Sequence, residues 1–197
     1  MNLKIIGLAG TNGSGKDTVG QILAEKHGYL FVSATDLLRA ELERRSLPPA
    51  REHMRALSAE WRRESGLGVL VDKVMAEYEK VKNRYTGVAM ASMRNPGEAD
   101  RIHDLGGTMV WVDANPRVRY ERIKANAANR GGLRAVDDQK TFEQFLSEEQ
   151  AEMHHSGDEA TLNMAGVKEE CDIFIENNSQ DLAKFQHEIE SSLELVK

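Results

Sequence analysis

With 197 residues and a single cysteine, the chain has a size that predicts one domain able to bury a stable core without a disulfide or a structural metal. Its net charge of −6 at pH 7 argues against a general nucleic-acid binder, because such proteins usually carry a basic surplus. The lone Cys171 favours a reducing, cytoplasmic setting, and no apolar run approaches the roughly 18 residues of a membrane span, so no membrane partner is expected.

Short apolar runs alternate along the chain with stretches in which apolar residues recur every three or four positions. These are the patterns of buried strands and of helices, respectively. In the first half of the chain they predict a strand over 3–9, a helix ending at Gly28, a strand over 29–32, mostly helical residues over 36–82 and a strand over 86–91. In the second half they predict a helix over 95–105, a strand over 108–113, a helix opened by Pro116, helices over 141–155 and 159–170, a strand over 172–175 and a helix over 182–195.

This alternation predicts an α/β fold in which a central five-stranded parallel sheet is covered by helices on both faces. Two long insertions interrupt it: a helical stretch over 36–84, broken by Pro48-Pro49 and by Gly66 and Gly68, and a polar, glycine-containing stretch over 126–158. Elements that close over a ligand are expected at these two insertions.

A glycine-rich segment follows the first predicted strand and opens the first helix: Gly10-Thr11-Asn12-Gly13-Ser14-Gly15-Lys16. Glycines let backbone N–H groups turn toward an anion, the helix N-terminus adds a positive dipole end, and the lysine supplies a mobile charge. The bare pattern is weakly specific, but its place between a strand and a helix is typical of a phosphate-binding loop. We therefore predict an ATP or GTP site formed by Gly10, Asn12, Gly13, Ser14, Gly15, Lys16, Asp17 and Thr18.

The residue after Lys16 departs from the usual loop. Asp17 stands where a magnesium-binding hydroxyl is common, so Mg²⁺ is expected to be held through Asp17 and a water, or by another residue. Thr18 is placed to touch a phosphate. A carboxylate beside a triphosphate is repelled unless a cation intervenes, which makes dependence on Mg²⁺ the expectation.

Further short motifs follow one another along the chain. They are Gly13-Ser14-Gly15-Lys16-Asp17-Thr18, Ser33-Ala34-Thr35-Asp36-Leu37-Leu38-Arg39, Met93-Arg94-Asn95-Pro96, Val112-Asp113-Ala114-Asn115-Pro116, Arg119-Tyr120-Glu121-Arg122 and Ile175-Glu176-Asn177. Together, and over nearly the whole chain, these motifs resemble P-loop small-molecule kinases of the dephospho-CoA kinase-like or adenylate kinase-like (nucleoside monophosphate kinase) family. The resemblance implies a three-layer P-loop NTPase fold, ATP and Mg²⁺ as cofactors, and a small-molecule phosphate acceptor, with acceptor binding at the insertion over 36–84 and a lid over 126–158.

The resemblance also implies roles for single residues. Asp36, at the sheet edge where ligands of open α/β sheets bind, would orient magnesium or accept the acceptor's proton, although a helix N-cap has the same signature. Arg39 and Arg94 would bind the acceptor's phosphate with two-pronged contacts. Arg122 would pack on the donor adenine, and the backbone of Asn177 would meet it, with a plain turn as the alternative for Asn177.

The chain departs from this family at two positions. Asn126 stands where these kinases usually carry an arginine aimed at the transferred phosphate, and Arg130 or Arg134 is the expected substitute. Ala91-Ser92 replaces the usual Asp-Gly after the third strand, so a metal-orienting carboxylate is missing there. With this substitution, Lys16, Asp36 and Arg130 are the predicted catalytic residues.

Most of the other reactive side chains are expected to have structural roles. Most arginines between 39 and 63 are expected on a solvated face, while one or two reach an acceptor phosphate. The adjacent His154 and His155 point in different directions on a helix and have no third ligand nearby, which argues against zinc. Cys171 is expected to be a small core residue.

The predicted function is Mg²⁺-dependent transfer of the γ-phosphoryl group of ATP to a phosphorylated small molecule. A nucleoside or deoxynucleoside monophosphate leads as acceptor, ahead of dephospho-CoA. The alternative is a regulatory nucleotide-binding module or slow NTPase without an acceptor, which Asp17, Ala91 and Asn126 favour, whereas Arg39 and Arg94 favour the kinase. A nucleic-acid end kinase is disfavoured by the acidic pI of about 5.6.

Overall fold

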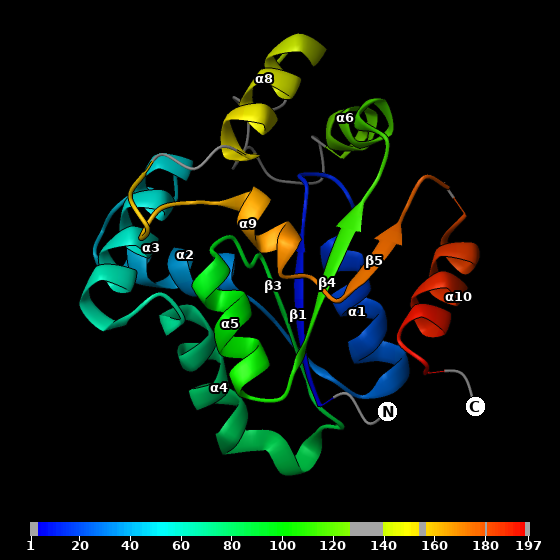
Figure 1. The fold of residues 1–197 in the computed structure, drawn as a ribbon, viewed down its shortest axis with the longest axis horizontal. Coiled ribbons are helices and arrows are strands. Elements are labelled where there is room, and N and C mark those ends of the chain that lie inside the picture. Colours follow the sequence, from blue (N-terminus) through cyan, green and yellow to red (C-terminus); the bar gives the residue numbers. More distant parts are fainter. Residues whose placement is uncertain (1–3, 127–139, 154–156, 180, 196–197) are drawn as a thin grey trace.

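The computed structural model describes residues 4–126, 140–153, 157–179 and 181–195 (Figure 1). Its centre is a sheet of five parallel strands in the order β2-β3-β1-β4-β5, which confirms the predicted α/β architecture. In the central strand, Leu8 lies beside Ala91 of β3 and Val110 of β4. The strands are β1 (Ile5–Gly10), β2 (Leu30–Ser33), β3 (Val88–Ala91), β4 (Thr108–Asp113) and β5 (Ile173–Glu176).

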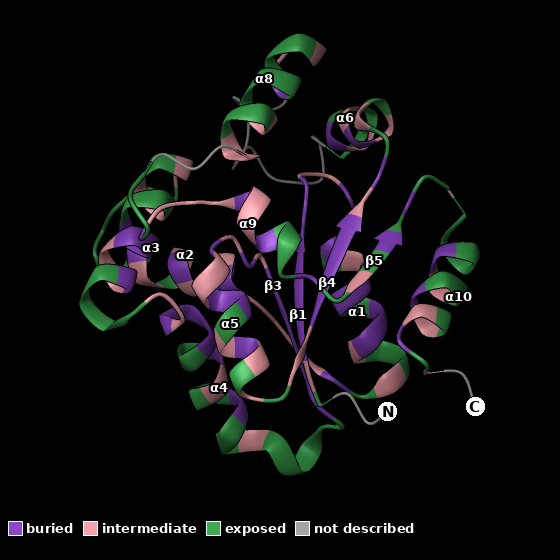
Figure 2. Ribbon diagram, in the orientation of Figure 1, coloured by how far each residue is buried: buried purple, intermediate pink, exposed green. Residues whose placement is uncertain are grey.

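Helices cover both faces of the sheet, which makes it the middle of three layers. On one side lie α1 (Lys16–His27) and α10 (Leu182–Ser192), and on the other α2 (Ala34–Arg44), α3 (Arg51–Ser65), α4 (Val69–Val81), α5 (Pro96–Asp104) and α9 (Met164–Glu169). The strands β1, β3 and β4 are almost wholly buried between these layers, as Figure 2 shows. Strands covered on both faces need apolar residues at successive positions, which is why continuous apolar runs predict them.

Two further helices lie beyond the carboxyl ends of the strands. They are α6 (Pro116–Ala125) and α8 (Phe142–Met153), seen above the sheet in Figure 1. The ring of Tyr120 on α6 contacts the rings of Phe142 and Phe145 on α8, with centroids 5.4 and 5.8 Å away. This aromatic contact holds α8 over the edge of the sheet at which ligands of parallel sheets bind.

The stretch 36–84 is helical as predicted, and consists of most of α2 together with α3, α4 and the short 3₁₀-helix η1 (Lys82–Arg84). The predicted breaks are confirmed, because Pro48-Pro49 lie between α2 and α3, and Gly66 lies between α3 and α4 with a φ of 94°. No helix among the described residues is both long and apolar enough to cross a membrane.

The predicted helix over 159–170 is wrong in its first part. Only Met164–Glu169 is helical, because the side chain of Asn163 caps the helix by accepting from the backbone N–H of Gly166 at 2.9 Å. The preceding loop is held instead by Asn95, whose Nδ2 donates to the carbonyls of Glu159 and Thr161 at 2.7 and 2.8 Å. Residues in this loop therefore bond to the start of α5 rather than to a helix of their own.

Candidate functional site

The loop between β1 and α1 has a backbone that only glycine accommodates. Gly10 and Gly15 have φ values of 142° and 100°. A Cβ on Gly10 would lie 2.0 Å from the carbonyl oxygen of Val112, and one on Gly15 would lie 2.4 Å from Nδ2 of Asn177. The loop therefore closes tightly against β4 and against the segment that follows β5.

The buried surface of this loop carries an unsatisfied polar atom. The side chain of Ser14 is fully buried, and its Oγ has no hydrogen-bond partner among the described residues. Lys16 begins α1 and is itself largely buried, while Gly15 at the N-cap provides no side chain to cap the helix. Buried polar groups are normally satisfied, so the loop and the first turn of α1 fit an anionic ligand that supplies acceptors.

Most of the predicted site residues line one open cleft of about 1220 Å³ at the carboxyl edge of the sheet, whereas Gly10 and the buried Ser14 lie behind it in the loop. It is bounded by the phosphate loop, the starts of α1 and α2, the residues after β3, the inner face of α6 and the segment after β5. Sequence reasoning placed residues far apart in the chain at this edge, and the structure brings them together. The cleft is lined by the predicted residues Asn12, Gly13, Gly15, Lys16, Asp17, Thr18, Asp36, Arg39, Arg94, Arg122 and Asn177.

On the α2 side of the cleft, Asp36 pairs with Arg39. The carboxylate accepts from Nη1 of Arg39 at 2.9 Å, one turn along the helix. The alternative that Asp36 is a helix N-cap is wrong, because the chain passes directly from β2 into α2 and the N-cap position belongs to Ser33. Asp36 lies in the first turn instead, with its side chain two-thirds exposed.

Arg94 is held in place at both ends. Its backbone N–H donates to Oε2 of Glu98 at 2.7 Å, and its Nη1 donates to Oε2 of Glu152 on α8 at 3.0 Å. Two residues earlier, Ser92 has a φ of 71° although it is not glycine, and its Oγ lies 3.4 Å from that of Ser33. Strained backbone of this kind tends to occur at functional sites. Ser92 occupies the position where glycine is usual in the resembled kinases.

Between α6 and the segment after β5, Arg122 and Asn177 join the phosphate loop in one hydrogen-bonded group. Arg122 donates from Nη1 to the carbonyl of Asn177 at 2.8 Å and from Nη2 to the carbonyl of Ser179 at 2.7 Å. Asn177 is buried and donates from Nδ2 to the carbonyl of Ser14 at 2.8 Å. Asn177 is therefore not a plain turn residue. Burial lowers the pKa of Arg122.

The residues expected to hold Mg²⁺ do not form a complete metal site by themselves. Asp17 and Asp36 both line the cleft, but the described part of the chain contains no group of three or more His, Cys, Asp or Glu side chains that could hold a metal. Mg²⁺ commonly takes one or two carboxylates and completes its shell with water and substrate phosphates. The two aspartates fit that mode of binding.

Sequence reasoning missed the side chains around Arg119. Arg119 is almost fully buried on α6 and donates to the carbonyls of Ala114 at 2.7 Å and of Asn12 at 3.4 Å. It also forms an ion pair with Glu149 of α8. Arg119 belongs to the motif that carried the family resemblance, but nothing in the sequence indicated that its partner lies on α8.

The structure describes part of the predicted lid over 126–158. Arg130 and Arg134 lie outside the described residues. Asn126 follows the last turn of α6 and lines the cleft. The predicted helix over 141–155 is confirmed for Phe142–Met153.

Comparisons with known proteins agree with this fold. A UPF0200 protein of Pyrobaculum aerophilum is 28% identical over 191 residues, which cover 95% of each chain. Adenylate kinase isoenzyme 1 of Sus scrofa is 29% identical over 147 residues, 73% of each chain. The crystal structure of shikimate kinase from Bacteroides thetaiotaomicron has the same fold, with a TM-score of 0.60 at 15% identity over 98% of both chains.

These likenesses confirm the predicted P-loop kinase-like fold. The family model described as "AAA domain" matches residues 6–150, which include the phosphate loop, the α2–α4 insertion, α6 and most of α8. The chain therefore belongs to the AAA domain family.

Proposed function

We propose that the protein transfers the γ-phosphoryl group of ATP to a phosphorylated small molecule in a Mg²⁺-dependent reaction. One observation carries the proposal: a single cleft contains a phosphate-binding loop with Lys16 and also two arginines, Arg39 and Arg94, that come from other elements. A nucleotide hydrolase needs only the first of these. A cleft with both can hold a donor triphosphate and an acceptor phosphate together.

The roles of the residues follow from the demands of phosphoryl transfer, which depends on positioning and on positive charge. The phosphate loop and Lys16 hold the donor phosphates, with the buried Oγ of Ser14 as an additional donor. Arg122 and Asn177 form the wall at which the donor base would lie. Bound Mg²⁺, held with Asp17 and Asp36, would neutralise charge that develops on the phosphate oxygens.

The acceptor that we favour is a nucleoside or deoxynucleoside monophosphate, with dephospho-CoA second. Support comes from the likeness to an adenylate kinase over 73% of the chain. It also comes from the two arginines, which suit an acceptor that already carries a phosphate. Arg130 is proposed as the lid residue that adds charge in the transition state.

A slow NTPase or regulatory nucleotide-binding module is the second candidate. The observation that favours it is at the end of β3, where the fully buried Ala91 is followed by Ser92, so neither position offers a carboxylate to orient a metal. If no acceptor is phosphorylated, the same cleft would still bind nucleotide through the phosphate loop.

The deciding experiment measures ADP release from ATP across a panel of acceptors. The panel contains nucleoside and deoxynucleoside monophosphates, dephospho-CoA, and the unphosphorylated hydroxy acid shikimate, with an acceptor-free control and the Lys16→Ala variant as a blank. We expect at least a tenfold stimulation by one phosphorylated acceptor and none with Lys16→Ala. If every acceptor leaves the rate of ADP release unchanged, the protein is a slow NTPase rather than a kinase. Stimulation by shikimate alone would exclude a phosphorylated acceptor.

A further inference from the structure

Three arginines converge on one carboxylate beside the phosphate loop. Arg55 of α3 donates from Nη2 to Oε1 of Glu152 at 2.6 Å, and Arg94 donates from Nη1 to Oε2 of the same residue at 3.0 Å. Nη1 of Arg51, at the start of α3, lies 3.8 Å from Oε1 of Glu152 and 3.8 Å from Oε2 of Glu148. Three separate elements, α3, the segment after β3 and α8, thus meet at Glu152.

The positive charge at this point exceeds what Glu152 can neutralise. Its two carboxylate oxygens face three guanidinium groups, each of which carries five N–H donors. The neighbouring Glu148 lies near both Arg51 and Lys140, and the Nζ of Lys140 is 2.5 Å from its Oε2. Burial raises the pKa of the Glu152 carboxyl, but the attraction of Arg94, Arg51 and Arg55 outweighs it, and the resulting pKa lies below the usual value. Glu152 is therefore a charged anion in a cluster with a surplus of cations.

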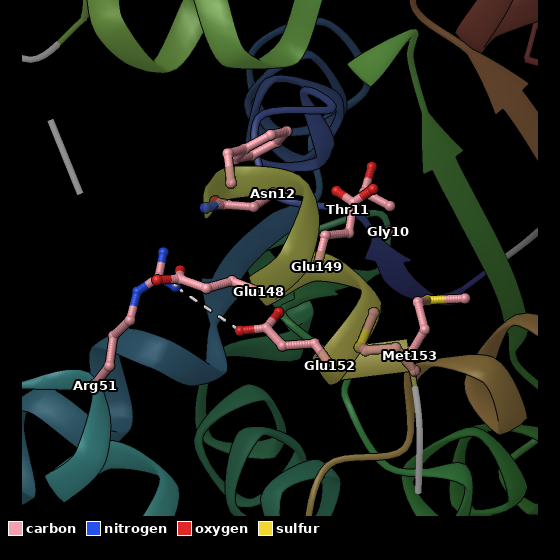
Figure 3. A pocket seen from close by; sticks show the side chains of 10 residues that line it. Gly10, Thr11, Asn12, Arg51, Glu148, Glu149, Glu152 and Met153 are labelled. Carbon is pink, nitrogen blue, oxygen red and sulfur yellow. Dashed lines mark ion pairs between the residues drawn. The ribbon is translucent and has the colours of Figure 1, made fainter. Parts of the chain in front are cut away.

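The cluster lies at the wall of the phosphate loop. Glu152 and Arg51 line a small cavity of about 20 Å³ together with Thr11 and Asn12 of the loop, and Figure 3 shows the side chain of Arg51 pointing toward α8. Arg94 also lines the main cleft, together with Lys16 and Arg39. A cavity of this size holds about one water. An anion in the main cleft can reach Arg94 directly, but the Glu152 carboxylate lies between Arg94 and Arg55. Such an anion can therefore contact all three guanidinium groups only by taking the place of that carboxylate.

We propose that Arg51, Arg55 and Arg94 bind the phosphate group of a phosphomonoester, and that Glu152 occupies this site until the phosphate displaces it. The proposal rests on the proposed function only in taking that phosphomonoester to be the acceptor. A phosphate dianion presents three oxygens and a second negative charge, so it matches three guanidinium forks better than a carboxylate does. Glu152 would thereby raise the phosphate concentration needed for binding and select against monoanionic ligands.

The test measures binding of inorganic phosphate by calorimetry, with the phosphate loop already filled by saturating AMP-PNP. The variants are Glu152→Gln, the matched control Glu148→Gln from the same face of α8, and Arg51→Gln/Arg55→Gln in both backgrounds. Thermal denaturation of each variant establishes that it is folded. We expect Glu152→Gln to tighten phosphate binding about tenfold, because a competing charge in contact with the arginines is removed. Glu148→Gln should change it less than threefold.

The arginine variants carry the second half of the test. Arg51→Gln/Arg55→Gln should abolish the gain in the Glu152→Gln background, and should weaken phosphate binding about tenfold in the otherwise unchanged protein. If Glu152→Gln does not fold, this second loss decides the question, since Arg55 is half exposed and lies on the surface of α3. Acetate should bind at least tenfold more weakly than phosphate to every folded variant.

Three results would overturn the proposal: unchanged phosphate affinity in Glu152→Gln, an equal gain in Glu148→Gln, or acetate binding as tightly as phosphate. The outcome is separable from that of the acceptor panel. A gain in phosphate affinity without phosphorylation of any acceptor would leave the anion site standing and refute the kinase. Phosphorylation of an acceptor whose KM is insensitive to Arg51, Arg55 and Glu152 would refute the anion site alone.

Discussion

Arg62 and Glu98 form an ion pair whose side chains are 2% and 0% exposed. Arg62 on α3 donates from Nη2 to Oε1 of Glu98 at 2.6 Å and from Nη1 to the carbonyl of Ala160 at 2.9 Å. The other oxygen of Glu98 accepts from the backbone N–H groups of Arg94 at 2.7 Å and Asn95 at 3.2 Å. One buried pair therefore joins the α2–α4 insertion to the start of α5 and fixes the backbone of a cleft arginine.

Removal of one partner of this pair should be costly. Arg62→Met leaves a buried, uncompensated carboxylate, and we expect a loss of about 3–5 kcal/mol in the free energy of unfolding. The double variant Arg62→Met/Glu98→Met should lose less than the sum of the single variants, since no unpaired charge remains. Urea denaturation measures both. The control Arg63→Ala removes an exposed pair with Asp158 and should cost less than about 1 kcal/mol. A loss of similar size from Arg63→Ala would show that burial does not set the cost.

Arg94→Ala should weaken binding of the acceptor and leave binding of ATP unchanged. Arg94 contacts Glu152 rather than the phosphate loop, so ATP should bind normally. A charge-assisted contact contributes about 1.5–3 kcal/mol, which predicts a rise of about tenfold to hundredfold in the KM of the acceptor. Steady-state kinetics with each substrate varied in turn measures this. Arg101→Ala, which removes an exposed pair with Asp72, serves as the control. Equal damage to both KM values would place Arg94 outside the acceptor site.

The parts of the fold that depend on local pattern were predictable from the sequence. The strands follow from continuous apolar runs, and the phosphate loop follows from glycines between a strand and a helix, as the φ values of Gly10 and Gly15 illustrate. The expected alternation of elements also fixed which residues share the carboxyl edge of the sheet. That is why Asp36 and Arg94 were placed in the cleft that they line.

The contacts that orient these residues were not predictable in the same way. Arg94 and Glu152 are 58 positions apart, and Arg62 and Glu98 are 36 apart, so neither pair has a helical or strand spacing. Their meeting depends on how α3, α5 and α8 pack, which a single sequence does not encode in any local pattern. The shortened helix α9 has the same cause, because the preceding loop bonds to Asn95 on a distant element.

Gly15→Ala should disrupt nucleotide binding through a steric clash. The new methyl group would lie 2.4 Å from Nδ2 of Asn177 and would break the hydrogen bond from Asn177 to Ser14. Gly106→Ala is the control, because Gly106 ends α5 with a φ of 72° and has nothing within 4 Å of the position that a methyl group would take. We expect about 1–2 kcal/mol of lost stability for the control from backbone conformation alone. Gly15→Ala should lose more stability than the control. It should also bind ATP at least tenfold more weakly, as measured by calorimetry. Equal losses of stability and of ATP affinity in Gly15→Ala and in the control would show that the contact with Asn177 is not what Gly15 protects.

Arg130→Ala tests the lid prediction. Asn126 cannot supply positive charge, yet the transition state of phosphoryl transfer spreads negative charge over the equatorial oxygens. We expect kcat to fall about 10²-fold with little change in ATP affinity, the pattern of a contact made mainly in the transition state. Arg134→Ala should matter less, because Asp137 and Asp138 are near in sequence and can pair with it. Single-turnover rates that survive the loss of both arginines would favour the slow NTPase.

The thiol of Cys171 should be unreactive in the folded protein. Burial, with the neighbouring charges of Asp172 and Glu170, raises the pKa of Cys171 to about 12, and its Sγ donates to the carbonyl of Val167 at 3.2 Å. A thiol with a pKa this high has about 10³-fold less thiolate at pH 8 than an ordinary cysteine, and the thiolate is the reactive form.

The folded state holds this proton more tightly than the unfolded state, so the stabilising effect is complete below pH 9, the ordinary pKa of the thiol, and is lost as the pH rises toward 12. Labelling with a disulfide reagent at pH 8 should therefore be at least about 100-fold slower for the native protein than for the protein in urea. Cys171→Ala removes the signal and serves as the blank. Rapid labelling of the native protein would mean that α9 opens readily away from the sheet, since Val167 and Met164 on that helix are buried with Cys171 in the same core.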